Sequence, residues 1–246
     1  MEKISQGKAY VAVALILAAA LIAASLIVTQ GFVKVKASQN TLSVKGSAKK
    51  EIKSDYAVWT GSFSVQSGQL SEAYSMLSND AAKVKQYLVD SGIPEKSIVF
   101  SAISTSTYNE ILPNGVYSNK IEGYRLFQSV EIKSADIDKI TELSRESTEL
   151  INQGVEFQSI PPQYFYTKLA DLKIEMIELA AKDAQLRAEK LLAVTGSKPG
   201  KLRAARLGVF QITPPFSNEV SDYGINDTSS IDKEITAVVS CDFEID

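Results

Sequence analysis

An apolar run from Ala9 to Val28, interrupted only by Tyr10 and Ser25, constrains this chain more than any other feature. It is about twenty residues long, and at ~1.5 Å of rise per residue a helix of that length crosses the ~30 Å hydrocarbon core of a bilayer. No later stretch of the sequence is of the same kind. We therefore divide the chain into a short N-terminal segment (1–8), a transmembrane anchor (9–29), a linker (30–40) and a folded domain (41–246).

A cleaved secretory signal is the alternative interpretation of this run. Lys3 and Lys8 supply a suitable basic start, but the apolar part of a signal usually has only ~7–15 residues. The nearest small-residue pattern, Val35-Lys36-Ala37, lies beyond the run and contains a lysine. We favour an uncleaved anchor, and both interpretations send the domain to a membrane or across it. Lysines lie on both sides of the run, so charge gives only a weak preference for a domain outside the cytoplasm.

Composition excludes several classes of function. The net charge is −3 and the sequence pI is about 5.3, so no global basic field exists to attract nucleic acid. The sequence contains no histidine, which removes the commonest general base and the usual metal ligand. Its one cysteine, Cys241, cannot form an internal disulfide.

The spacing of apolar residues predicts an α+β domain. Alternation at period two predicts seven strands and spacings of three and four predict three helices. The predicted strands are 41–45, 55–66, 98–108, 121–133, 155–160, 202–213 and 234–245, and the predicted helices are 70–88, 137–150 and 167–195. The order is ββαββαβαββ, whose middle is the βαββαβ unit of ferredoxin-like folds. We expect a mostly antiparallel sheet with helices packed on one face.

Several details of these elements are specific enough to be checked. In the strand 55–66 the core face should be Ala57, Trp59, Gly61, Phe63 and Val65, and in the first helix the core stripe should be Leu70, Tyr74, Leu77, Ala81, Val84 and Leu88. Ser134 is the expected N-cap of the second helix. Ala180, Ala184 and Ala188 form a row on which a sheet or helix could pack closely. The first and last strands are both candidates for sheet edges.

These elements carry motifs that resemble the SIMPL family, the YggE-like proteins that include periplasmic immunogenic proteins of bacteria. The matching motifs are Leu42–Gly46, Ser54–Ala57, Gly92-Ile93, Gly123-Tyr124 and the alanine-rich stretch from Ala181 to Gly196. The resemblance implies an envelope protein with no established enzymatic activity and a tendency to form large oligomers. Together with the predicted anchor, the resemblance leads us to expect a single-pass protein of the bacterial inner membrane with its domain on the periplasmic side.

No motif for catalysis, a cofactor or a metal stands out. Gly196–Lys201 has three residues between its glycines where a P-loop needs four, so a helix stop and turn is expected. The loop 218–232 carries Glu219, Asp222, Asp227 and Asp232; calcium binding is the alternative to a solvated loop, but the spacing is not that of an EF-hand. Asn226-Asp227-Thr228 fits the N-glycosylation pattern, which matters only in a eukaryotic secretory pathway. Cys241 lies on the apolar face of the last strand, so we expect it to be buried.

The aromatic cluster Tyr164, Phe165 and Tyr166 follows two prolines. Core packing is the favoured interpretation, and a subunit contact is the alternative, because interface cores are enriched in aromatic residues.

The expected function is that of a membrane-anchored, non-enzymatic envelope protein that self-assembles as a homo-oligomer and is linked to stress tolerance. An envelope binding protein for a small ligand or lipid is the alternative. A hydrolase is disfavoured by the missing histidine and by the lack of a Gly-x-Ser-x-Gly elbow.

Overall fold

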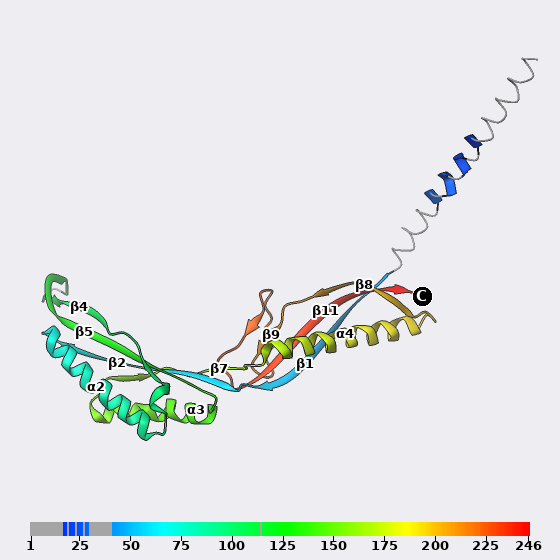
Figure 1. The fold of residues 1–246 in the computed structure, drawn as a ribbon. Coiled ribbons are helices and arrows are strands. Elements are labelled where there is room, and N and C mark those ends of the chain that lie inside the picture. The colour runs from blue at the N-terminus through cyan, green and yellow to red at the C-terminus, as the bar shows by residue number, and fades with distance from the viewer. Residues whose placement is uncertain (1–16, 19, 23, 27, 30–40, 114) are drawn as a thin grey trace, which may run out of the picture. The chain divides into compact units, whose positions relative to one another are not determined.

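The computed structural model describes residues 17–18, 20–22, 24–26, 28–29, 41–113 and 115–246 (Figure 1). All described residues before position 30 are helical. Among the described residues, no helix is both long enough and apolar enough to cross a membrane. The predicted anchor 9–29 lies partly outside the described residues, and the segment 1–8 and the linker 30–40 lie wholly outside them.

The chain divides into two compact units, which are described separately here. The first unit comprises Met1–Ala48, Glu175–Gly208 and Ala237–Asp246, and the second comprises Lys49–Ile174 and Val209–Thr236. The predicted α+β class is confirmed, but the strands form two sheets rather than one.

A six-stranded antiparallel sheet belongs wholly to the second unit (Figure 1). Its strand order is β3-β5-β2-β6, with β4 paired to β5 and β7 paired to β2. Helix α2 leads from β2 to β3, and α3, continued by a 3-10 helix (Ser147–Gln153), leads from β5 to β6. Each helical crossover thus skips one strand, as in a split βαββαβ unit. The elements are β2 (Tyr56–Ser67), α2 (Leu70–Asp90), β3 (Ile98–Phe100), β4 (Ser104–Ile111), β5 (Tyr117–Ser134), α3 (Ile137–Glu146), β6 (Phe157–Ser159) and β7 (Gln163–Phe165).

The core of the second unit lies between this sheet and its two helices. The predicted core face of β2 is confirmed, because its odd-numbered residues from Ala57 to Val65 are all buried. The predicted stripe of α2 is wrong in its first turns, where Leu70 and Tyr74 are exposed and Ala73 is buried. Apolar residues flank the stripe on both sides there, so spacing alone does not fix the buried face.

The cap of α3 also differs from the prediction. Asp136, rather than Ser134, is the N-cap, and its carboxylate accepts a hydrogen bond from the backbone N–H of Lys139 at 3.1 Å. The Ser134 hydroxyl accepts a hydrogen bond from the backbone N–H of Asp136 at 3.0 Å, so it holds the turn just before the N-cap. Gly154 ends the helical segment with a φ of 78°, as predicted.

The five-stranded sheet has the order β1-β11-β9-β10, with β8 also paired to β11. Strand β11 runs antiparallel to β8 and β9, and β9 and β10 are parallel. Strand β1 is an edge, as predicted, but the prediction that the last strand is an edge is wrong, because β11 has neighbours on both sides. The elements are β1 (Thr41–Lys53), α4 (Leu169–Ala193), β8 (Pro199–Leu207), β9 (Gln211–Thr213), β10 (Ile225–Asn226) and β11 (Asp232–Ile245).

In the first unit, β1 packs against the alanine row of α4 at Gly46. Ala180, Ala184 and Ala188 are fully buried. A Cβ on Gly46 would lie 2.2 Å from the Ala180 carbonyl oxygen and 2.3 Å from the Ala184 nitrogen. The close packing predicted for the alanine row is therefore made by a strand, and only glycine fits at the contact.

Two predicted strands are broken in the structure. β3 and β4 both pair with β5, but residues 101–103 stand opposite only Gln128 and Ser129. In the same way, residues 208–210 between β8 and β9 stand opposite only Ala237 and Val238 of β11. One extra residue at each place interrupts the ladder.

Candidate functional site

The predicted aromatic cluster divides between the core and the surface of the second unit. Tyr164 is only 6% exposed, and its hydroxyl lies 2.9 Å from that of Thr141. Phe165 and Tyr166 remain half-buried. Core packing therefore holds for Tyr164, while the subunit contact stays a prediction for the two residues that follow it.

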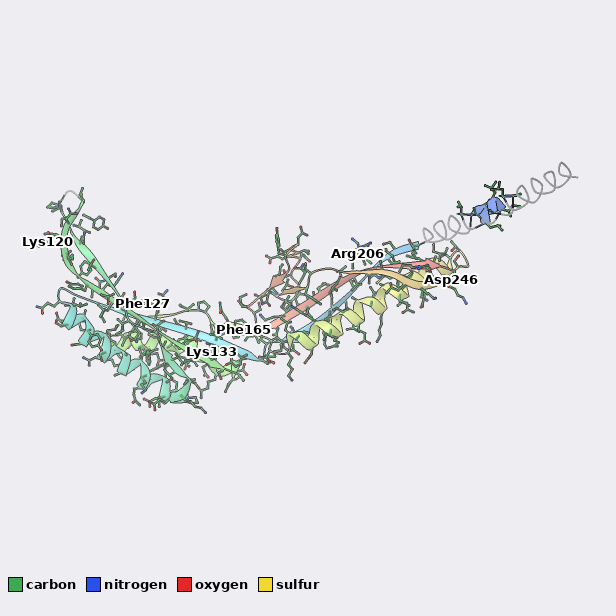
Figure 2. All side chains as sticks on the ribbon, turned by 45° about the horizontal axis from the view of Figure 1, so that its top comes forward. Lys120, Phe127, Lys133, Phe165, Arg206 and Asp246 are labelled. Atoms are coloured by element: carbon green, nitrogen blue, oxygen red, sulfur yellow. The ribbon has the colours of Figure 1, made fainter. Side chains whose placement is uncertain are left out.

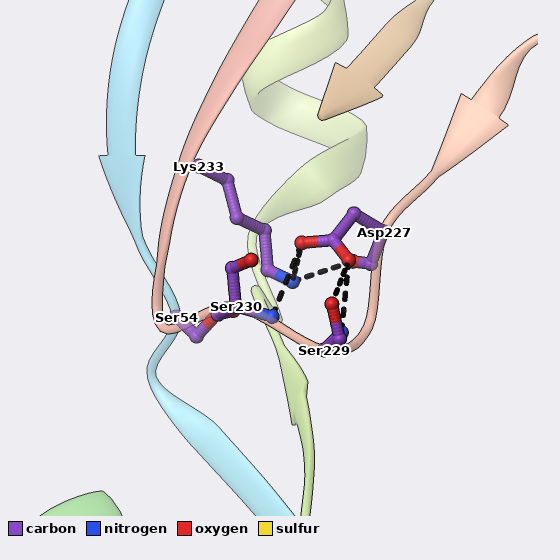
Figure 3. Close-up of polar contacts among 5 residues, drawn as sticks. All are labelled: Ser54, Asp227, Ser229, Ser230 and Lys233. Carbon is purple, nitrogen blue, oxygen red and sulfur yellow. Dashed lines mark hydrogen bonds and ion pairs between the residues drawn. The ribbon is translucent and has the colours of Figure 1, made fainter. Parts of the chain in front are cut away.

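The four acidic residues of the loop 218–232 do not converge. Within the described residues, no group of three or more His, Cys, Asp or Glu side chains could hold a metal ion. Asp227 instead turns inward and meets Lys233 of β11 (Figure 3). The prediction of a wholly solvated loop is therefore wrong for this part of it.

Lys233 is a buried cation at the start of β11. Its side chain is only 2% exposed, because position 233 lies in the same alternation as the buried Ile235 and Ala237. The ammonium donates to the backbone carbonyl of Asp227 and lies 3.3 Å from the Asp227 carboxylate. Burial lowers the pKa of Lys233, and the charge and hydrogen bond of Asp227 oppose that shift.

Asp227 is held by four donor groups (Figure 3). Its carboxylate accepts from the backbone N–H and hydroxyl of Ser229, at 2.9 and 2.7 Å, and from the backbone N–H of Ser230 at 3.2 Å. Burial raises the pKa of this carboxyl, but the hydrogen bonds from Ser229 and Ser230 and the charge of Lys233 outweigh it and bring the pKa to about 2.

Three backbone hydrogen bonds tie this loop to other segments of the second unit. The Ser54 N–H donates to the Ile231 carbonyl at 2.9 Å, and the Tyr164 N–H donates to the Thr228 carbonyl at 2.8 Å. The Asp227 N–H donates to the Ile212 carbonyl at 2.9 Å. The ion pair therefore fixes the point where these segments meet.

Asp55, which follows Ser54 in the chain, makes a second polar contact. Its carboxylate accepts from the backbone N–H and the hydroxyl of Thr167, both at 2.7 Å. Thr167 precedes α4 by two residues, so this contact fixes the segment that leads into the helix. Asp55 belongs to the Ser54–Ala57 motif, and its geometry gives that motif a structural role.

This arrangement holds the loop in place. The Asp227 carboxylate at 3.3 Å favours the protonated form of Lys233, although burial lowers the pKa of Lys233 on balance. The cavity beside the pair, lined among others by Phe165 and Tyr166, measures about 50 Å³. Ligand sites usually measure about 300–1,000 Å³. The pair therefore fixes the loop beside a small cavity.

The other candidates from the sequence are structural. Cys241 is 2% exposed, as expected, and burial, together with the charge of Asp242, raises its pKa. Gly196 follows the end of α4 with a φ of 76°, as predicted, but the predicted turn Gly196–Lys201 is shorter in the structure, because β8 begins at Pro199. Sequence reasoning missed the Asp227–Lys233 pair, although a lysine in phase with a buried strand face was a usable signal.

Comparison with known proteins gives one match that covers most of the chain. Residues 42–243 match the family described as "SIMPL: Protein of unknown function (DUF541)". No curated protein matches the chain in sequence.

One similar solved structure is the crystal structure of an amidase of the hydantoinase/carbamoylase family from Burkholderia multivorans. It is 11% identical, with a TM-score of 0.22, over 49% of this chain and 28% of the amidase. A likeness of that size supports neither a fold nor an activity for this chain. The family match covers far more of the chain, because residues 42–243 extend from β1 to β11. The chain belongs to the SIMPL family.

Proposed function

We propose that this chain is a membrane-anchored, non-enzymatic envelope protein of the SIMPL type that works as a self-assembling interaction module. The apolar run Ala9–Val28 supports the anchor, and the family resemblance supports an inner-membrane protein with its domain outside the cytoplasm. A link to stress tolerance is part of the proposal and is supported only by the resemblance to the SIMPL family. The net charge of −3 disfavours nucleic acid as a binding partner.

The observation that carries the proposal is an exposed apolar tip on the β4–β5 hairpin. Ile111 and Tyr117 are paired across the two strands and are 58% and 70% exposed. Leu112 and Ile121 are exposed beside them. We call Ile111, Leu112, Tyr117 and Ile121 the hairpin tip; Lys120 marks its place in Figure 2. A cluster of exposed apolar side chains on one hairpin is typical of an interaction site.

The charged side chains of the core support a role without catalysis. Asp227 and Lys233 are bonded to each other, so neither is available to a substrate. The other ion pairs are at least partly exposed, as in Lys182–Glu178, where each side chain is more than 60% exposed.

Cross-linking in membranes tests the role of the hairpin tip. We expect an amine-reactive cross-linker to yield dimers of the wild-type chain, and the double substitution Ile111→Ser/Tyr117→Ser to reduce their yield several-fold. The matched control is Val220→Ser/Tyr223→Ser, which changes two side chains that are 80% and 97% exposed outside the tip. Equal dimer yields from both double variants would show that the tip is not the contact.

Protease treatment of intact spheroplasts tests the topology. We expect added protease to degrade the domain while a cytoplasmic marker survives. Survival of the domain until lysis would place it in the cytoplasm and contradict the proposal.

A further inference from the structure

The face of the six-stranded sheet that points away from α2 and α3 carries a groove of about 400 Å³. In β2 the odd-numbered residues face the helices, so Ser62 and Ser64 face the opposite side. The cross-strand partners of these serines in β5 and β6 share that face, and they include Phe127, opposite Ser64, and Gln158, opposite Ser62. All of the lining residues belong to the second unit.

Ser62 is the first sign that the groove is built for a ligand. Its side chain lines the groove, and its hydroxyl makes no hydrogen bond to another described residue, although the residue as a whole is only 4% exposed. No buried side-chain oxygen or nitrogen among the described residues lacks a partner, so the Ser62 hydroxyl is reachable from the groove. It is therefore open to a hydrogen bond with a polar ligand.

Phe127 is the second sign. Its ring is 41% exposed in the groove, and its cross-strand neighbours are the small residues Ser64 and Ser104. These small neighbours leave the phenyl ring accessible; Phe127 is labelled in Figure 2. An exposed aromatic ring among hydroxyls can pack against the apolar face of a ligand whose edge is polar.

The charges of the groove balance each other. The Arg125 guanidinium lies 3.7 Å from the Glu156 carboxylate. With the Gln66 amide turned so that its oxygen faces Arg125, that oxygen accepts two hydrogen bonds from the guanidinium, at 2.6 and 2.9 Å. One positive and one negative group therefore line the groove, and the guanidinium is already engaged. An anion would meet the Glu156 carboxylate, so the lining favours an uncharged ligand.

We propose that this groove binds an uncharged carbohydrate, with one pyranose ring of an oligosaccharide seated on Phe127. The C–H face of a pyranose is apolar and its rim carries hydroxyls, which matches a phenyl ring surrounded by Ser62, Gln158 and Glu156. A peptide strand would pair along the free edge of β6 rather than lie across the sheet face, where the backbone bonds of β2 to β5 and β6 are already made. Carbohydrate binding is a function beyond self-assembly and does not depend on the hairpin tip.

Titration of the full chain with neutral trisaccharides tests this site. Chitotriose and maltotriose are the probes, and the detergent must have no sugar headgroup, because such a headgroup would compete. We expect saturable binding of at least one trisaccharide in calorimetry, with saturation transfer to its ring protons in NMR. Phe127→Ala should weaken binding about tenfold through loss of the ring contact. The matched control Phe216→Ala, which removes a phenyl ring that is 94% exposed elsewhere in this unit, should bind as the wild type does.

Ser62→Ala separates a binding role from a structural one. Because the hydroxyl has no partner in the protein, its loss should leave the unfolding midpoint unchanged or raised, while binding weakens about threefold or more. No saturable binding of either trisaccharide, or equal binding by the Phe127→Ala and Phe216→Ala variants, would overturn the proposal. Displacement of a bound trisaccharide by inorganic phosphate would also overturn it, because it would identify an anion site.

Discussion

Lys233 and Asp227 show how one buried charge can determine the course of a loop. The side chains of Lys233 and Asp227 are 2% and 10% exposed, and the ammonium lies 3.3 Å from the carboxylate. A buried ion pair is weak evidence for net stability, but removal of one partner leaves a buried charge without compensation. The pair therefore makes the path of residues 227–233 depend on both side chains.

Asp227→Asn should destabilise the full chain by about 3 kcal/mol. The asparagine oxygen can still accept from Ser229 and Ser230, so the expected loss comes from Lys233, whose charge stays buried. Chemical denaturation measures the free energy of unfolding, and Asp222→Asn is the matched control because Asp222 is exposed in the same loop. Equal stability of the two variants would show that the pair is dispensable.

Acid should weaken the fold through the same carboxylate. The pKa of Asp227 is about 2 in the folded chain against an ordinary value of 3.8. A lowered folded pKa gives stability that is present above the unfolded value and is lost as pH falls through the folded one. We expect a loss of about 2 kcal/mol between about pH 4 and pH 2. The difference in unfolding free energy between wild type and Asp227→Asn should shrink over this window; a constant difference would contradict the assignment.

At the scale of the elements, the contact between β1 and α4 depends on glycine. Gly46→Ala would place a Cβ 2.2 Å from the Ala180 carbonyl oxygen, and backbone on both sides cannot give way easily. We expect a loss of about 3 kcal/mol in unfolding free energy, at the upper end of overpacking effects. Gly68→Ala is the control, because its Cβ would meet nothing closer than 3.8 Å. Its stability should stay within about 1 kcal/mol of the wild type. A Gly46→Ala variant as stable as this control would contradict the packing.

The elements also show what the sequence could predict and what it could not. Alternation predicted β2 and β11 because both strands keep one unbroken apolar face. It did not predict the breaks after β3 and β8, because each break follows from one extra residue relative to the partner strand. The extra residue can be recognised only when the two paired strands are compared, so the sequence of one strand alone does not reveal it.

The candidate site was harder to predict for the same reason. The Asp227–Lys233 pair was missed because charged residues are usually exposed, although the phase of Lys233 in β11 pointed inward. The groove residues Ser62 and Phe127 lie more than sixty positions apart, and only the register of β2 with β5 brings their rows together. A polar row facing solvent carries no periodic signal that marks it as a ligand site.

At the scale of the whole molecule, the chain combines an apolar N-terminal run, a SIMPL domain and an apolar hairpin tip. The tip was not predicted as a contact, and Ile111, Leu112 and Tyr117 lie between the predicted strands 98–108 and 121–133. Its exposed side chains give self-assembly a physical basis that the half-buried Phe165 and Tyr166 provide less clearly.

The native mass of the full chain, extracted in a mild detergent and measured by light scattering with correction for bound detergent, tests whether the protein self-assembles through the hairpin tip. A single chain has a mass of 26.7 kDa. We expect a protein mass that is a fixed multiple of this value and falls when Ile111 and Tyr117 are both replaced by serine. A single-chain mass for the wild type at micromolar concentration would contradict it.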